Sequence, residues 1–152
     1  MRLKLSKSEL ASIKAALERA GDKEIGGQLF GQQIEPSHFR VTTMTIQARP
    51  GTFSRFFVDL FQALRDAAKF FEKTGHEYRR FNYIGEWHSH PSFAVQPSGI
   101  DVQTMRNLVT DPSFLGGFAV LVILKLNGDH VEAGAWLFDP NGSLRGIELE
   151  AD

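Results

Sequence analysis

The chain has 152 residues, of which 42% are hydrophobic, which suits one compact domain and is too short for two ordinary ones. Seventeen basic and eighteen acidic residues give a net charge of −1, so no overall field recruits nucleic acid or an anionic membrane. The absence of cysteine excludes disulfides, thiolate metal sites and a cysteine nucleophile. We therefore expect a single domain over residues 1–152, in which any metal is held by nitrogen and oxygen ligands.

The chain shows no targeting or membrane signal. Its first twenty residues lack the apolar run of a signal peptide, and no stretch approaches the roughly 18 apolar residues of a membrane span. A cytoplasmic protein is therefore the expectation.

Residues 6–21 have the pattern of a first helix. Ser6 and Glu9 fit a capping box, apolar residues follow at helical spacing, and Gly21 supplies a stop. Residues 24–34 and 38–46 are then expected to form two strands that are joined near Glu35.

Three glycines lie in the first of these strands, at positions 26, 27 and 31. Glycine lowers strand propensity and often marks the close approach of another group. The glycines are either simple bends or a place where a substrate backbone lies against the strand edge as an added strand. We favour the second interpretation.

A second, longer helix is predicted before Gly75. Its apolar residues share one helical face, which should pack on a sheet, and they are Phe57, Leu60, Phe61, Leu64, Ala68 and Phe71.

The second half of the chain adds four strands and a helix. Residues 81–90 read as a strand, Ser98 begins a shorter helix, and the apolar run 118–126 is typical of a central strand buried on both faces. An Asn-Gly turn at Asn127 leads into a strand over 130–138, and a last strand is expected over 143–150. The order is helix, two strands, helix, strand, helix, three strands, which predicts an α/β protein with a mixed β-sheet sandwiched by helices.

Two histidines provide the strongest chemical signal. His88 and His90 are two residues apart on a predicted strand, so both imidazoles project from one face and can chelate one ion. A catalytic zinc site usually has three protein ligands and an open position, and Asp101, in the first turn of the next helix, is the best third candidate. Ser98 and Asp101 also form a capping-box pattern, and a capping role does not exclude metal ligation. His38, His76 and His130 are interpreted as structural or solvated.

Hydrolysis at such a site also needs a general base. Spacing alone does not identify it, since Glu86 shares the strand face of His88 and Glu24 opens the glycine-rich strand.

The chain also has phenylalanines near its predicted loops, Phe53, Phe56 and Phe93. They could present an apolar patch to a partner protein.

The string HSH (His88 to His90), followed after the ten residues PSFAVQPSGI by Asp101, matches the His-x-His, ten residues, Asp pattern of one family. Pro91, Pro97 and Ser98 also match, as does an upstream glutamate followed by GGQLFG. The chain therefore resembles the JAB/MPN (JAMM) zinc metalloproteases, in particular their compact prokaryotic branch.

This resemblance implies the JAB/MPN fold, which is cytidine-deaminase-like, and one Zn²⁺ per chain held by His88, His90 and Asp101. It implies Glu24 as general base and Ser98 as the donor that stabilises the oxyanion. The expected substrate is a ubiquitin-like protein or its conjugate, cleaved after the C-terminal tail of the ubiquitin-like protein, either in deconjugation or in precursor processing. Such enzymes accompany bacterial ubiquitin-like, sulfur-carrier or antiphage defence systems.

Two other functions compete with this one. A non-catalytic MPN-type scaffold would use the fold only to bind partners, but such relatives typically lack a ligand that this chain retains. A zinc hydrolase of small amides is the other candidate, whereas deaminases with a P-C-x-x-C motif need cysteine.

Overall fold

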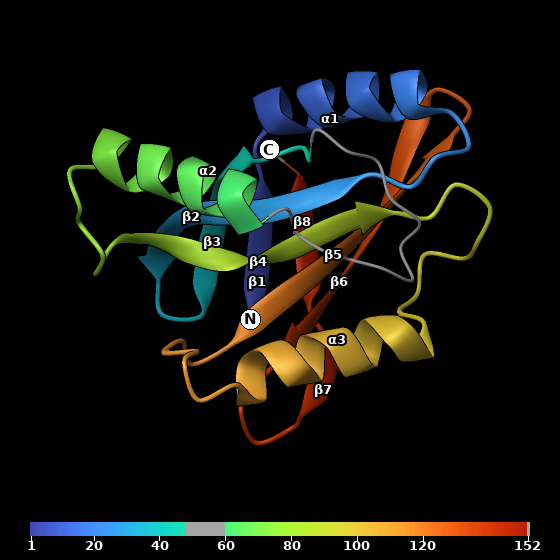
Figure 1. The fold of residues 1–152 in the computed structure, drawn as a ribbon. Coiled ribbons are helices and arrows are strands. Elements are labelled where there is room, and N and C mark those ends of the chain that lie inside the picture. The colour runs from blue at the N-terminus through green and yellow to red at the C-terminus, as the bar shows by residue number, and fades with distance from the viewer. Residues whose placement is uncertain (48–59, 152) are drawn as a thin grey trace.

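The computed structural model describes residues 1–47 and 60–151. The described helices are α1 (Lys7–Ala20), α2 (Leu60–Lys73) and α3 (Gly99–Thr110) (Figure 1). The described strands are β1 (Arg2–Leu5), β2 (Gly26–Glu35), β3 (His38–Met44), β4 (Phe81–Ser89), β5 (Ala119–Asn127), β6 (His130–Phe138), β7 (Leu144–Gly146) and β8 (Glu148–Ala151). No helix in these ranges is long and apolar enough to cross a membrane.

The strands form one mixed sheet in the order β7-β6-β5-β4-β2-β3-β1-β8. β1 pairs in parallel with β3 and β8, β4 pairs in parallel with β5, and the other neighbours are antiparallel. The predicted mixed sheet is thus confirmed, with β1 as an additional strand. The predicted last strand is divided into β7 and β8, which lie at opposite edges of the sheet although they are consecutive in the chain.

Helices cover both faces of the sheet, as expected. On one face, α1 packs through Ile13 and Leu17 into a core that contains Trp87. On the other face, α3 packs through Met105 and Val109 against β5. The helix α2 lies on the same face as α3 (Figure 1), where Phe70 stacks on Phe30 of β2 and the helix also contacts β4. The run predicted to be buried on both sides is β5, whose first six residues are buried.

The predicted face of α2 is wrong in part. Leu64 is 59% exposed and Ala68 is exposed, whereas Ala63 and Phe70 are buried. The ring of Phe70 stacks on that of Phe30 with centroids 4.9 Å apart, and this contact turns a neighbouring apolar stripe toward the sheet. Phe57 and the side chains of Leu60 and Phe61 lie outside the described residues.

The cap of α1 also differs from the expectation. Ser6 caps the helix, because its hydroxyl accepts a hydrogen bond from the backbone N–H of Glu9 at 3.3 Å. The Glu9 carboxylate does not complete the box, since it accepts from the backbone N–H of Met44 on β3 at 2.7 Å. The side chain therefore ties α1 to the sheet. Gly21 ends the helix, as predicted, with a positive φ of 59°.

The interpretation of the β2 glycines as an open edge for substrate is wrong. β2 is an interior strand, paired with β3 on one side and β4 on the other. A Cβ at Gly27 would lie 2.0 Å from the carbonyl oxygen of Thr45, and one at Gly26 would lie 2.5 Å from that of Trp87. The close approach that glycine permits here is to the chain's own backbone.

We predict that Gly27→Ala destabilises the protein by about 1–3 kcal/mol, because the added methyl group collides with a backbone carbonyl that has no room to move. Gly146→Ala is the matched control, since a Cβ at this strand glycine meets nothing within 4 Å. Chemical unfolding measures both changes. Equal stabilities of the two variants would contradict the packing that we describe for β2.

Candidate metal centre

The end of β4 brings two imidazoles together. His88 belongs to β4, and His90 follows it with its backbone N–H bonded to the carbonyl of Leu124 on β5. The alternation of the strand thus continues to His90, and the two Nε2 atoms lie 3.0 Å apart. Both side chains are buried, His88 to 1% exposure. Two nitrogen lone pairs at this distance need a proton or a cation between them.

Asp101 comes to the histidines from α3. It is the third residue of the helix, and its Oδ1 lies 3.4 Å from His88 Nε2 while its Oδ2 lies 3.5 Å from His90 Nε2. The capping box forms as well: Ser98 N donates to Asp101 Oδ2 at 2.7 Å, and Asp101 N donates to Ser98 Oγ at 3.1 Å. Cap and cluster therefore use the same carboxylate, as the sequence allowed, and the cap fixes its position beside the two rings.

The geometry of the three side chains fits a metal ion. All three are buried and offer ligand atoms within 4.8 Å of one another. Tetrahedral zinc with bonds of about 2.0–2.1 Å places its ligand atoms about 3.3 Å apart, close to the 3.0, 3.4 and 3.5 Å observed between the pairs. His90 Nδ1 lies 2.9 Å from the carbonyl oxygen of Ala94. A hydrogen bond there places the ring proton on Nδ1 and leaves Nε2 free to bind.

The electrostatics favour the same use. Burial lowers the pKa of His88, which keeps its imidazole neutral and able to coordinate. Burial acts to raise the pKa of Asp101, but its hydrogen bonds with His88 and Ser98 lower it below its ordinary value. The cluster therefore presents an ionised carboxylate beside a neutral ring.

Strand register places Glu24 next to this cluster. β2 and β4 are antiparallel with Gly26 opposite His88, and the pairing continues, since Ser89 N donates to the Ile25 carbonyl at 2.8 Å. Glu24 precedes Ile25, so its backbone lies at the same end of the sheet as the two histidines. It is half-buried, two residues before the start of β2.

Glu86 lies on the same face as His88 but further inside, opposite Gln28. The register of β4 shifts at Ile84, which is an extra residue relative to β2. This bulge turns Tyr83 and Glu86 to one side, so that the Tyr83 hydroxyl donates to Glu86 Oε1 at 2.6 Å. Tyr83 was not identified from the sequence, because residues three apart on a regular strand face opposite ways.

Burial dominates the chemistry of this pair. Glu86 is only 8% exposed, and burial raises its pKa to about 8, although the hydrogen bond from Tyr83 acts to lower it. Burial, together with the charge of Glu86, raises the pKa of Tyr83 well above its ordinary value. At neutral pH the Glu86 carboxyl is therefore mainly protonated.

The remaining histidines have the structural or solvated surroundings that we predicted. His38 lies 3.7 Å from Glu150, His76 Nδ1 lies 2.9 Å from the Tyr78 hydroxyl, and His130 is largely exposed. Of the proposed apolar patch, Phe93 is 63% exposed beside His90, with ring centroids 6.1 Å apart. Phe53 and Phe56 lie outside the described residues.

A mixed sheet covered by helices, with a buried His-His-Asp cluster that could hold a metal ion at the end of a central strand, defines an α/β domain with a candidate metal centre. Residues 6–139 match the model of the prokaryotic homologs of the JAB domain, and the chain belongs to this family.

One protein of known name and one solved structure are also similar to this chain. The chain is 30% identical over 151 residues to a protein of Enterobacter hormaechei subsp. hoffmannii (strain UCI 50) named CD-NTase/cGAS isopeptidase. The match covers 93% of this chain and 75% of that protein. The solution structure of protein DSY2949 from Desulfitobacterium hafniense has a TM-score of 0.67 at 18% identity and covers 99% of this chain and 92% of its own, which shows a shared fold.

We predict that Glu86→Gln stabilises the metal-free protein increasingly as the pH rises from 5 to 8. The folded state raises the Glu86 pKa to about 8 from 4.5, so wild type loses stability over this window as the unfolded chain releases the proton that the folded chain keeps. The effect should reach a few kcal/mol at pH 8, because a difference of one bound proton changes the free energy of unfolding by about 1.4 kcal/mol for every pH unit.

Thermal melts of chelator-treated wild type and Glu86→Gln at several pH values measure this difference. Glu77→Gln is the matched control, because Glu77 is exposed. A stability difference between wild type and Glu86→Gln that is the same at pH 5 and pH 8 would count against the buried, protonated carboxyl.

Proposed function

We propose that the protein is a zinc-dependent isopeptidase or peptidase that cleaves after the C-terminal tail of a ubiquitin-like protein, in deconjugation or precursor processing. The observation that carries this proposal is the buried convergence of His88, His90 and Asp101. Family membership and the isopeptidase name of the Enterobacter relative support the reaction class. A bacterial ubiquitin-like or antiphage defence system is the setting that we infer.

The donor set favours zinc among the common metals. Two imidazole nitrogens and one carboxylate oxygen are typical ligands of catalytic zinc, which keeps a further position for water or substrate. When bound, zinc supplies the Lewis acidity that lowers the pKa of water and polarises a carbonyl group. His88, His90 and Asp101 would hold it, with the rotation of His90 restricted by its contact with the Ala94 carbonyl.

Glu24 is the proposed general base. Such a base takes a proton from the attacking water and returns it to the leaving amine, so it must reach both solvent and the scissile bond. Glu24 is half-buried and lies two residues before the start of β2, whose first residue, Gly26, pairs with His88, which fits this requirement. Glu86 fits it less well, because its carboxyl is enclosed and already accepts a hydrogen bond from Tyr83.

Ser98 is the proposed donor to the oxyanion. Its oxygen accepts the hydrogen bond from Asp101 N, and a serine hydroxyl that accepts in this way can still donate its own proton. The side chain is exposed at the start of α3, at the N-cap position that precedes the helix carrying Asp101. From there it could stabilise the charge that develops on the scissile carbonyl oxygen.

We predict that the purified protein binds about one zinc ion per chain and that His88→Ala and His90→Ala each lose it, because two remaining ligands bind zinc weakly. Elemental analysis after dialysis measures the metal content. His130→Ala is the matched control, since His130 is exposed, and should retain the metal. Wild type that takes up no zinc when zinc is added would refute the metal centre.

We predict that Glu24→Gln keeps its zinc and loses cleavage by at least about 100-fold, because an amide can hydrogen-bond but cannot accept the proton. Cleavage is followed on a lysine-linked conjugate and on a linear fusion of a ubiquitin-like protein. Glu86→Gln is the matched comparison and should retain most activity. Normal turnover by Glu24→Gln would end the base assignment, and a selective loss in Glu86→Gln would transfer the role to Glu86.

The same assay distinguishes the competing functions. A non-catalytic scaffold would bind the conjugate without cleaving it, although it holds the full ligand set. A hydrolase of small amides would cleave a short amide and leave both protein substrates intact.

A further inference from the structure

A cavity lies at the end of the sheet opposite to the metal centre. It has a volume of about 450 Å³, within the range of about 300–1,000 Å³ typical of small-molecule sites. Its walls come from the second half of β2, the starts of β3 and β4, the loop between α2 and β4, and the loop between α3 and β5. Tyr83, in its wall, precedes His88 by five residues, roughly 15 Å along a strand. The residues of the metal centre do not line it.

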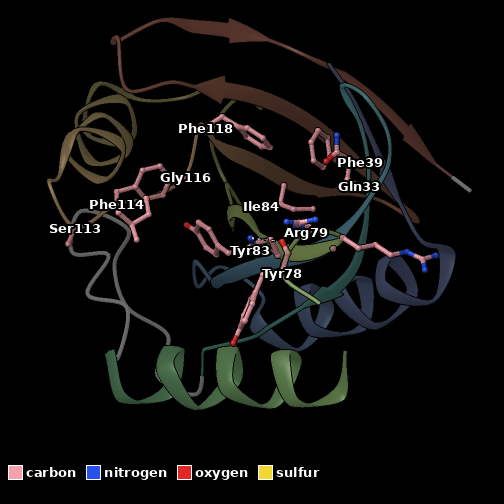
Figure 2. Close-up of a pocket in the computed structure, with 15 residues that line it drawn as sticks. Gln33, Phe39, Tyr78, Arg79, Tyr83, Ile84, Ser113, Phe114, Gly116 and Phe118 are labelled. Atoms are coloured by element: carbon pink, nitrogen blue, oxygen red, sulfur yellow. Dashed lines mark hydrogen bonds between the residues drawn. The ribbon is translucent and has the colours of Figure 1, made fainter. Parts of the chain in front are cut away.

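Aromatic rings from separate parts of the chain surround the cavity. Figure 2 shows Phe39, Phe114, Phe118 and Tyr83 arranged around its interior. Phe39 and Phe118 meet edge to face with centroids 5.1 Å apart, which joins β3 to the start of β5. These rings offer flat, weakly polar surfaces of the kind that stack on a planar ligand.

The charged residues of the lining are cationic. Arg79 and Arg80 line the cavity, and none of the described lining residues is an aspartate or glutamate. With the Gln32 amide oriented so that its oxygen faces Arg80, that guanidinium donates to it at 2.7 and 2.8 Å, and it also lies 5.3 Å from the Phe81 ring centre. Arg80 is therefore held in place by these contacts, and both arginines are exposed at the rim. A concave surface with two cations and no acid in its lining attracts an anion.

The loop between α3 and β5 leaves room for a ligand. Gly117 lines the cavity, and a Cβ added there would meet nothing within 4 Å. Leu115, on the same loop, is almost completely exposed and lies at the rim rather than in the interior. The cavity is thus open at this loop.

We propose that this cavity is a binding site for a small aromatic anion of the nucleoside monophosphate class, with the ring system among the aromatic side chains and the phosphate at Arg79. Guanidinium groups bind phosphate through several hydrogen bonds at once, and aromatic side chains stack on nucleobases. The site does not depend on the proposed function of the metal centre, from which it is separated along β4.

The first experiment titrates AMP, adenosine and ribose 5-phosphate into chelator-treated protein by calorimetry. Removing metal prevents the phosphate from reporting on the cluster at His88. AMP should bind with one site per chain, and adenosine and ribose 5-phosphate should each bind at least about tenfold more weakly, because each lacks one of the two recognised groups.

Two substitutions place the binding in the cavity. Arg79→Gln should weaken AMP about tenfold and leave adenosine unchanged, since it removes only the cation. Gly117→Leu should abolish binding of both, because its side chain enters the open space.

The controls repeat each change elsewhere: Arg19→Gln on the exposed surface of α1, and Gly146→Leu on β7, where there is also open space. Both should bind AMP like wild type, and melting temperatures establish that each variant is folded.

Three results would overturn the proposal. The first is no heat of binding with millimolar AMP. The second is AMP binding that persists unchanged in both Arg79→Gln and Gly117→Leu. The third is ribose 5-phosphate binding as tightly as AMP, which would show that the aromatic walls contribute nothing.

Discussion

The antiparallel pairing of β2 with β4 is the interaction on which the metal centre depends. Its register places Gly26 opposite His88 and, through the bond from Ser89 N to the Ile25 carbonyl, brings the residues before β2 to the end of β4. A slip by one residue would turn both histidines to the other face, into the core around Trp87. Glycines in β2 allow the strands to lie this close, because a Cβ added at these positions would collide with neighbouring backbone. The apolar core on one face therefore selects the register that assembles the polar cluster on the other.

Asp101 connects this sheet to α3 through a single carboxylate. A buried charge is costly unless it is paired and hydrogen-bonded. Here the backbone N–H of Ser98 and the two imidazoles provide those contacts. The hydrogen bonds of the cap involve only atoms of the chain, so the helix start itself holds the carboxylate in position. Such preorganisation reduces the reorganisation that binding would otherwise require.

The elements that local pattern determines could be predicted from the sequence, and those that distant contacts determine could not. The histidine pair follows from strand alternation and Asp101 from its place in the helix, and both are found where expected. α2 carries two overlapping apolar stripes, and only the contact with Phe30 selects one of them. The Glu9 carboxylate does not take part in the expected capping box, because it accepts a hydrogen bond from a backbone N–H 35 residues away. Likewise, the interior position of β2 and the bulge that brings Tyr83 to Glu86 arise from strand pairing, which local sequence does not encode.

The short segment from Leu144 to Ala151 has a mechanical consequence. It contributes β7 to one edge of the sheet and β8 to the other, with Ile147 between them bonded to the Ala135 carbonyl. These eight consecutive residues therefore connect the two edges of the sheet directly. Each outer strand is only three or four residues long, which leaves little unpaired backbone for another chain to extend. Because the two edge strands are joined by this segment, we expect the fraying of one to destabilise the other, so that the sheet unfolds as one cooperative unit.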